Sequence, residues 1–301
     1  MKRILQSRPY EFMIQFTPQR EWIERRGILV WLALYFIELG AGTFVVSSIF
    51  GVLPGMFVGW LICAVLGGGL HLLYLGRPGR AWRMIISSGW KTSWMSRGLY
   101  FVVTFLVLGS VQMILTQRLS STTGLLIITD FFAFCTVAYA GFVMNFVNGI
   151  QLWNTALLPA LFTLSGVWGG IGLSIVVASS TGAEMIAIRL EPWTQVFLMG
   201  YAFIISTYLV SVRYSGLAGR FSVRNMLTGK WGMLFWGLVV SFGILFPVGA
   251  TFLLRVQSSI IANTFLYILI FFELLGDLSL RYCILRCGYY QPMIPSTNFS
   301  F

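Results

Sequence analysis

The 301-residue chain is 57% hydrophobic and only 10% charged, with a formal net charge of +11. A soluble domain has about 25% charged residues, so this composition excludes an ordinary soluble enzyme. Apolar runs of about 20 residues, long enough to cross a bilayer as helix, recur along the chain. The sequence therefore predicts an all-α integral membrane protein, since these runs lack the alternation typical of barrel strands.

The first 26 residues contain no apolar core of the signal-peptide type, because charged residues interrupt them throughout. We expect residues 1–26 to form a cytosolic or interfacial arm. The interrupting residues are Arg8, Glu11, Arg20, Glu21, Glu24, Arg25 and Arg26.

Eight transmembrane helices are predicted, arranged as two four-helix bundles within a membrane domain of residues 27–301. Residues 27–150 form the first bundle, 151–284 form the second, and 285–301 form a C-terminal tail. The predicted spans are 27–49, 53–75, 98–116, 125–150, 156–178, 193–212, 232–254 and 260–284.

Basic residues gather on one side of this arrangement. We define face A as the side that holds the N-terminus and face B as the other side. Face A receives 17 of the 20 Lys and Arg residues, and face B keeps Arg118, Arg189 and Arg255. The positive-inside rule then predicts an inner-membrane protein with both termini in the cytoplasm. The same basic loops can instead be a docking surface for an acidic partner, and both interpretations stay open.

The counts of histidine and cysteine limit the redox groups that this protein can hold. A haem held by two imidazoles needs two histidines, and an iron–sulfur cluster normally needs four suitably spaced cysteines. The sequence has one histidine, His71, and four scattered cysteines without a CxxC pair. We therefore expect no haem, no iron–sulfur cluster and no metal site here, and small apolar roles for Cys63, Cys135, Cys283 and Cys287.

Polar groups inside membrane spans are costly to bury and are candidates for function. Tyr35, Glu38, His71, Tyr139 and Asn145 all fall in the face-A half of their spans. For each of them a structural role, such as a hydroxyl bonded to a neighbouring backbone, remains an alternative.

The last span carries Glu273, Asp277 and Arg281 in its face-A half, spaced by four residues and hence on one helix face. They are candidates for proton transfer, although an ordinary structural ion pair between Asp277 and Arg281 is the simpler interpretation. Tryptophans near span ends predict an interfacial belt. These are Trp90, Trp94, Trp153, Trp193 and Trp231.

Four stretches of the sequence, in order, resemble the NrfD/PsrC family of membrane subunits of polysulfide reductase and related quinone-linked oxidoreductases. The first is Tyr35-Phe-Ile-Glu-Leu-Gly-Ala-Gly42, and the second runs from His71 to Trp82 with Ser96-Arg97-Gly98 after it. The third comprises Tyr139-Ala-Gly141, Leu152-Trp153-Asn154-Thr155 and Leu157-Leu158-Pro159, and the fourth runs from Glu273 to Gly276, followed by Leu280-Arg281-Tyr282.

The resemblance implies a quinone site in the first four-helix bundle. Tyr139 matches the quinone-contacting tyrosine of the family, and Tyr35 stands where the polysulfide reductase subunit has a quinone-contacting histidine. His71 and Asn145 are expected to lie near the same site. Glu38, together with Glu273, Asp277 and Arg281, is a candidate for proton exchange.

The resemblance also implies partners: a ferredoxin-type iron–sulfur subunit and a catalytic subunit that is often molybdopterin-dependent. Arg77, Arg80 and Arg83 are expected to contribute to docking. The substrate is then menaquinone or ubiquinone, with membrane lipid around the protein and no nucleic acid. The protein is expected to be a quinone-reactive membrane anchor rather than an enzyme acting alone. A secondary transporter and a redox-inert anchor are the alternatives.

Overall fold

A computed structural model describes residues 24, 26–80, 82–83, 91, 93–116, 118, 122–254 and 262–290. Their regular structure is helical, and the β-type pairing within them is an isolated antiparallel bridge between Ile150 and Tyr290. The all-α prediction is therefore confirmed. Most of the predicted arm 1–26, the end of the predicted tail and Trp90 lie outside the described residues.

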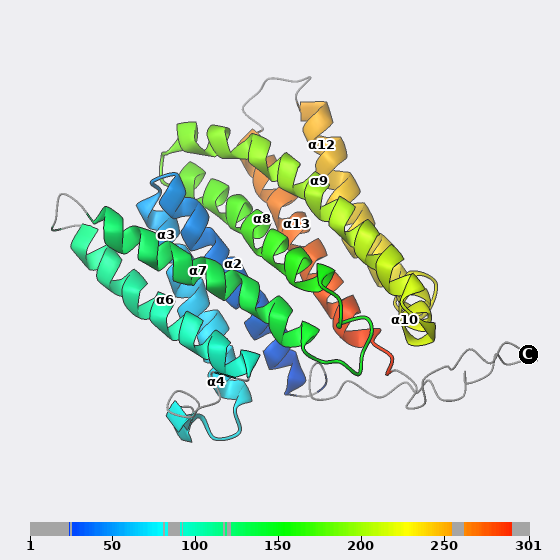
Figure 1. The fold of residues 1–301 in the computed structure, drawn as a ribbon. Helices are drawn as coiled ribbons and strands as arrows, with labels where there is room; N and C mark the ends of the chain where they lie inside the picture. The colour runs from blue at the N-terminus through cyan, green and yellow to red at the C-terminus, as the bar shows by residue number, and fades with distance from the viewer. Residues whose placement is uncertain are drawn as a thin grey trace, which may run out of the picture.

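The long helices follow the predicted spans in sequence order (Figure 1). They are α2 (Gly27–Ile49), the continuous second span of α3 (Leu53–Leu61), η2 (Ile62–Gly68) and α4 (Gly69–Tyr74), then α6 (Trp94–Thr116), α7 (Thr123–Asn145), α8 (Leu157–Ser180) and α9 (Glu184–Tyr214). After α10 (Leu217–Leu227) come α11 (Gly232–Leu234), η5 (Phe235–Leu245) and α12 (Phe246–Leu254), and finally α13 (Ala262–Arg286). A short 3₁₀ turn, η3 (Pro78–Arg80), follows the second span.

Several boundaries differ from those predicted. Helix α9 has 31 residues and begins nine positions before the predicted start at 193. At 1.5 Å per residue it is about 46 Å long, more than the roughly 30 Å of hydrocarbon, so helix continues past the apolar segment. Helix α7 ends at Asn145 rather than at 150, and α6 begins at Trp94 rather than at 98.

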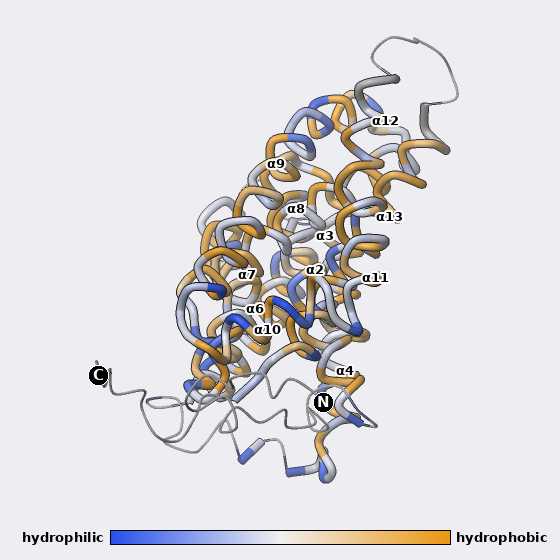
Figure 2. The backbone as a smooth tube through the Cα atoms, turned by 90° about the vertical axis from the view of Figure 1, so that its right-hand side faces the viewer, coloured by the Kyte–Doolittle hydropathy of each residue, from blue (hydrophilic) through white to orange (hydrophobic). Residues whose placement is uncertain are grey.

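Among the described residues, seven helices are long and apolar enough to cross a membrane. Helix α13, with 25 residues, is as long as these but carries Glu273, Asp277 and Arg281, and it is not among the seven. The predicted count of eight spans therefore stays a prediction. Figure 2 shows hydrophobic residues over much of the tube, with hydrophilic segments near α4 at its lower end.

Helix α2 lies at the centre of the packing and contacts the second span, α7 and α8. Small residues make the close approach of α2 to α8 feasible, as is common in membranes. A Cβ at Gly42 would lie 2.0 Å from the carbonyl oxygen of Gly166. Helices α2, α3, α6 and α7 contact one another in a ring, whereas α8 contacts α9 and α13, and α13 contacts η5.

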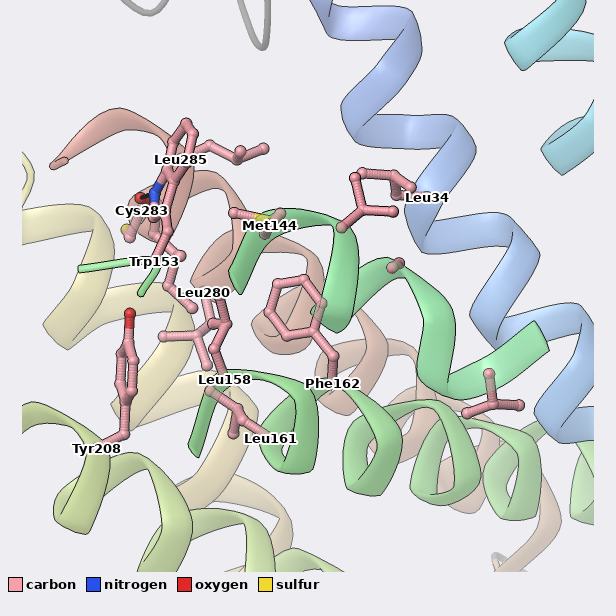
Figure 3. Packing of buried hydrophobic residues seen from close by; sticks show 14 of the residues in the cluster. Leu34, Met144, Trp153, Leu158, Leu161, Phe162, Tyr208, Leu280, Cys283 and Leu285 are labelled. Atoms are coloured by element: carbon pink, nitrogen blue, oxygen red, sulfur yellow. Dashed lines mark hydrogen bonds between the residues drawn. The ribbon is translucent and has the colours of Figure 1, made fainter. Parts of the chain in front are cut away.

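The described core joins these two groups of helices (Figure 3). Trp153 precedes α8 and is fully buried, and its indole Nε1 donates to the carbonyl oxygen of Ile284 at 2.8 Å. Tyr208 on α9 donates to the carbonyl oxygen of Leu152 at 2.6 Å. The expectation that Trp153 belongs to an interfacial belt was wrong, because a partner for its N–H exists inside the protein. Trp193, by contrast, is half exposed.

Candidate functional site

A cavity of about 290 Å³ lies among α2, the second span, α6 and α7. Its walls are mainly aliphatic, with Leu34 from α2 and Leu99 from α6 among them. Polar side chains enter from two helices: His71 from α4 and Tyr139 from α7, with Tyr74 also in the lining. The lining residues come from the face-A halves of α2, α6 and α7, so the cavity lies near the end of the molecule that carries α4 (Figure 1).

The imidazole of His71 is held by its own helix. Its Nδ1 lies 3.3 Å from the carbonyl oxygen of Gly67. A carbonyl oxygen only accepts, so Nδ1 carries the proton in this contact and Nε2 of the neutral ring is an acceptor. Gly67 belongs to the π-helical stretch η2, and such stretches inside helices are frequent at functional sites.

Tyr139 completes the polar side of the cavity. Its hydroxyl lies 3.5 Å from Nε2 of His71, a long contact in which the hydroxyl donates. Its ring packs directly on Gly98 of α6, where an added Cβ would lie 2.2 Å from the ring atom Cδ2. Glycine at position 98 thus allows α6 to approach close enough to fix the tyrosine ring.

The other two predicted quinone-binding residues lie elsewhere. The hydroxyl of Tyr35 donates to the carbonyl oxygen of Leu274 on α13 at 3.0 Å. Tyr35 is buried and does not line the cavity. Asn145 is the last residue of α7, is partly buried and is likewise not in the lining. The structure therefore brings Tyr139 to His71 and does not bring Tyr35 opposite Tyr139.

A second polar group is a buried cluster centred on Arg281. Its guanidinium pairs with Glu38 of α2 and lies 3.3 Å, from Nε to Oδ2, from Asp277. It also donates to the hydroxyl of Ser165 on α8. We call Glu38, Asp277, Arg281, Ser165 and Tyr201 the arginine cluster.

Both carboxylate oxygens of Asp277 are hydrogen-bonded. Ser165 donates to Oδ2 at 2.9 Å, and the hydroxyl of Tyr201 on α9 donates to Oδ1 at 2.8 Å. Tyr35 is adjacent, with the Arg281 guanidinium 5.3 Å from the centre of its ring. The arginine cluster thus ties α2, α8, α9 and α13 together inside the apolar core.

Glu273, predicted to belong to the face-A half with Asp277 and Arg281, is near the middle of α13 and lines a separate cavity between α9, α12 and α13. The three predicted docking residues, Arg77, Arg80 and Arg83, are exposed beyond the end of α4, and Arg83 lies 5.6 Å from the ring centre of Trp82. In the described part of the protein, no group of three or more His, Cys, Asp or Glu side chains is placed to hold a metal ion.

Sequence reasoning foresaw Glu38 and Arg281 as separate candidates but did not pair them. Ser165 and Tyr201 were not foreseen at all. In the sequence, each of these residues is only a hydroxyl in an apolar segment of α8 or α9. Such a hydroxyl can also donate to a carbonyl oxygen of its own helix, so it does not predict a distant partner. Ser174 of α8, for example, donates to the carbonyl oxygen of Gly170 at 2.7 Å.

Apolar helices packed around an internal cavity define a multi-pass helical membrane protein. A family model described as polysulphide reductase, NrfD, matches residues 26–293. The protein therefore belongs to the NrfD family, as the resemblance in its sequence indicated.

Individual relatives agree with this assignment. The C subunit of polysulfide reductase from Wolinella succinogenes is 26% identical over 310 residues, covering 88% of this sequence and 96% of the relative. Protein NrfD of Escherichia coli is 26% identical over 223 residues, covering 61% of this sequence and 67% of the relative. The Protein NrfD homolog of Haemophilus influenzae is 28% identical over 158 residues, 50% of this sequence, and the match spans about half (48%) of that relative.

Proposed function

We propose that this protein is the quinone-interacting membrane anchor subunit of a multi-subunit respiratory oxidoreductase. It passes electrons between the membrane quinone pool and an iron–sulfur partner subunit. The observation that carries this proposal is the cavity of about 290 Å³ with aliphatic walls and the polar pair of His71 and Tyr139.

The chemistry of a quinone suits this cavity. A quinone has an apolar ring and tail and two oxygens that accept hydrogen bonds, while the reduced quinol donates them. Tyr139 has one O–H, so it can donate to an oxygen of a bound quinone only in place of its long contact to His71. Nε2 of His71 is then open to accept from a hydroxyl of the quinol. The aliphatic walls suit a menaquinone or a ubiquinone head equally.

Oxidation of a quinol releases two electrons and two protons. His71 lines the cavity beside Tyr139, and its Nε2 is the acceptor that we propose for the first proton. Glu38, Asp277 and Arg281, which lie together in the arginine cluster, remain our candidates for carrying protons further, as does Glu273.

The electrons require a partner, because one histidine and four scattered cysteines do not form the ligand sets of a haem or an iron–sulfur cluster. The relative from Wolinella succinogenes is one subunit of polysulfide reductase, which supports a multi-subunit assembly for this protein as well. We propose a ferredoxin-type iron–sulfur subunit and a catalytic subunit of the kind that is often molybdopterin-dependent in the family. The exposed residues Arg77, Arg80 and Arg83 follow the helix that carries His71, so docking there would bring a cluster near the cavity.

For localisation we propose the inner membrane with face A in the cytoplasm. The support is the distribution of charge, with 17 of the 20 basic residues assigned to face A. Reporter fusions test it: the fusion after Arg80 must report the cytoplasm, and the fusion after Arg118 must report the opposite side.

The test of the quinone site compares two buried tyrosines. Tyr139→Phe removes the hydroxyl that faces the cavity, whereas Tyr35→Phe removes one that bonds Leu274. A hydrogen bond of about 0.5–1.5 kcal/mol corresponds to a change of roughly 2- to 12-fold in quinol affinity. We expect this loss for Tyr139→Phe and unchanged affinity for Tyr35→Phe, measured by titrating the intact complex with a short-tailed naphthoquinol and a short-tailed ubiquinol.

Unchanged kinetics with both quinols in an intact Tyr139→Phe complex would refute the site. A loss confined to Tyr35→Phe would move the quinone head to the α13 side of α2.

A further inference from the structure

The second cavity, of about 200 Å³, lies between α9, α12 and α13. Its lining residues on α9 come from the first half of that helix, and those on α13 from Leu266 to Glu273. Both segments begin at the face-B end of their helices. The cavity therefore occupies the bilayer half opposite the one that holds His71 and Tyr139. Figure 1 shows α12 at the upper end of the molecule and α4 at the lower end.

Two buried polar side chains face this cavity. Glu273 lines it and is 6% exposed. Thr194 also lines it, is 8% exposed, and its Oγ1 is buried with no hydrogen-bond partner in the described structure. Bound water or an ion is one explanation for such an atom. Of the six described residues with one, Thr194 is the residue that lines either cavity. A water molecule takes up about 30 Å³, so the cavity has room for several.

No described residue that lines the cavity is a cation that could balance the charge of Glu273. The charged groups described near Glu273 are acidic. Glu191 on α9 lines the cavity and is exposed, and Asp277 lies one turn after Glu273 on α13. None of the residues described as lining the cavity, including Val248 and Thr251 from α12, is Lys, Arg or His. An ionised carboxylate without a cationic partner is very costly to bury, so Glu273 must bind either a proton or a small cation.

The connection beyond Glu273 favours the proton. Asp277 lies on the same helix face, and both of its oxygens are bonded within the arginine cluster. A proton can pass along such hydroxyl and carboxyl groups, whereas a metal ion would have to displace the Arg281 guanidinium. We propose that this cavity is a proton-access chamber, open to the face-B half, in which Glu273 exchanges its proton with water. The proposal holds whether or not a quinone binds in the other cavity.

The first experiment uses dicyclohexylcarbodiimide, an apolar reagent that adds to protonated carboxyl groups. The full complex is labelled at neutral pH, and modified peptides are identified by mass spectrometry. We expect label on Glu273 and none on Glu38 or Asp277, which line neither of the two cavities. Glu273→Gln is the control for the site of addition.

Label on Glu273 that persists in 200 mM NaCl or KCl supports the proton. Protection by either salt identifies a cation site and overturns the proposal, as does labelling of Glu273 no stronger than that of Asp277.

The second experiment tests access by water. Thr194→Cys is treated with a charged, membrane-impermeant methanethiosulfonate in sealed vesicles of both orientations. The unsubstituted complex is treated in the same way to measure the background reaction of the four native cysteines. We expect modification at position 194 only from the side opposite to Arg80. Modification from the Arg80 side, or none in a folded complex, would contradict the chamber. If the proposed quinone site is wrong, quinol affinity will be unchanged in Tyr139→Phe. The labelling of Glu273 and the modification at position 194 do not depend on that result.

Discussion

The face-A cavity and the arginine cluster both contain a buried tyrosine and ionisable side chains, yet they differ in what surrounds those groups. In the cluster, Asp277 has both oxygens bonded, and Arg281 contacts Glu38, Asp277 and Ser165. In the cavity, the polar ends of His71 and Tyr139 share one long contact, and both side chains line unfilled volume. Burial and polarity are therefore not sufficient to identify a ligand site in this membrane protein. Polar groups beside unfilled volume indicate a ligand site, whereas polar groups that bond mainly to one another in a packed core hold helices together.

The largest effect is expected from Arg281→Met. Removing the cation leaves Glu38 and Asp277 buried without it, which typically costs about 3–5 kcal/mol. We expect little assembled complex and a markedly lower midpoint of thermal unfolding in mild detergent. The triple variant Glu38→Gln, Asp277→Asn, Arg281→Met removes all three charges and should recover much of that stability. An Arg281→Met complex as stable as the unsubstituted one would show that the cluster is not a brace.

In the cavity, His71→Gln should preserve the fold and impair turnover. General base catalysis typically contributes 10²-fold or more, so we expect quinol oxidation to fall by about 10²-fold. When the iron–sulfur clusters of the partner are reduced chemically, without quinol, their spectrum should match that of the unsubstituted complex. The measurement is steady-state quinol oxidation alongside the spectrum of the partner clusters. Unaltered turnover would remove His71 from the proton path and leave only its contact to Gly67.

Gly98→Ala tests whether the Tyr139 ring is held by close packing. The added Cβ would lie 2.2 Å from the ring, so either the ring or α6 must shift. Overpacking of this kind typically costs about 1–3 kcal/mol. We expect weaker quinol binding and a modestly lower thermal midpoint. The matched control is Gly124→Ala at the start of α7, where an added Cβ meets nothing within 4 Å. Equal effects from the two variants would contradict the packing argument.

The smallest effect is expected from Arg286→Gln, one turn and a residue beyond Arg281 on α13. Arg286 pairs with Glu24 at 2.5 Å, but the two side chains are 20% and 34% exposed. Partly exposed ion pairs contribute about 1 kcal/mol or less. We expect a thermal midpoint close to that of the unsubstituted complex. A loss comparable with that of Arg281→Met would mean that exposure is a poor guide to the strength of these pairs.

The sequence by itself determined the class of the protein and the positions of its long helices. Hydropathy depends on local composition, and seven of the predicted spans correspond to helices that meet the length and composition of a membrane span. The ordered motifs also indicated the family that the match over residues 26–293 shows. The predicted helix boundaries were less accurate. Helices such as α9 continue beyond the apolar segment, and hydropathy does not detect these additional helical residues.

Only the tertiary structure decided what each polar group faces. Tyr35 and Tyr139 look alike in the sequence, but the first bonds α13 and the second faces a cavity beside His71. Glu273 and Asp277 are one turn apart, yet one lines a cavity and the other is enclosed by the arginine cluster. The physical reason is that a side chain's partner is set by which helices pack together and how closely. That closeness depends on contacts between distant residues, such as Gly42 with Gly166 and Gly98 with Tyr139.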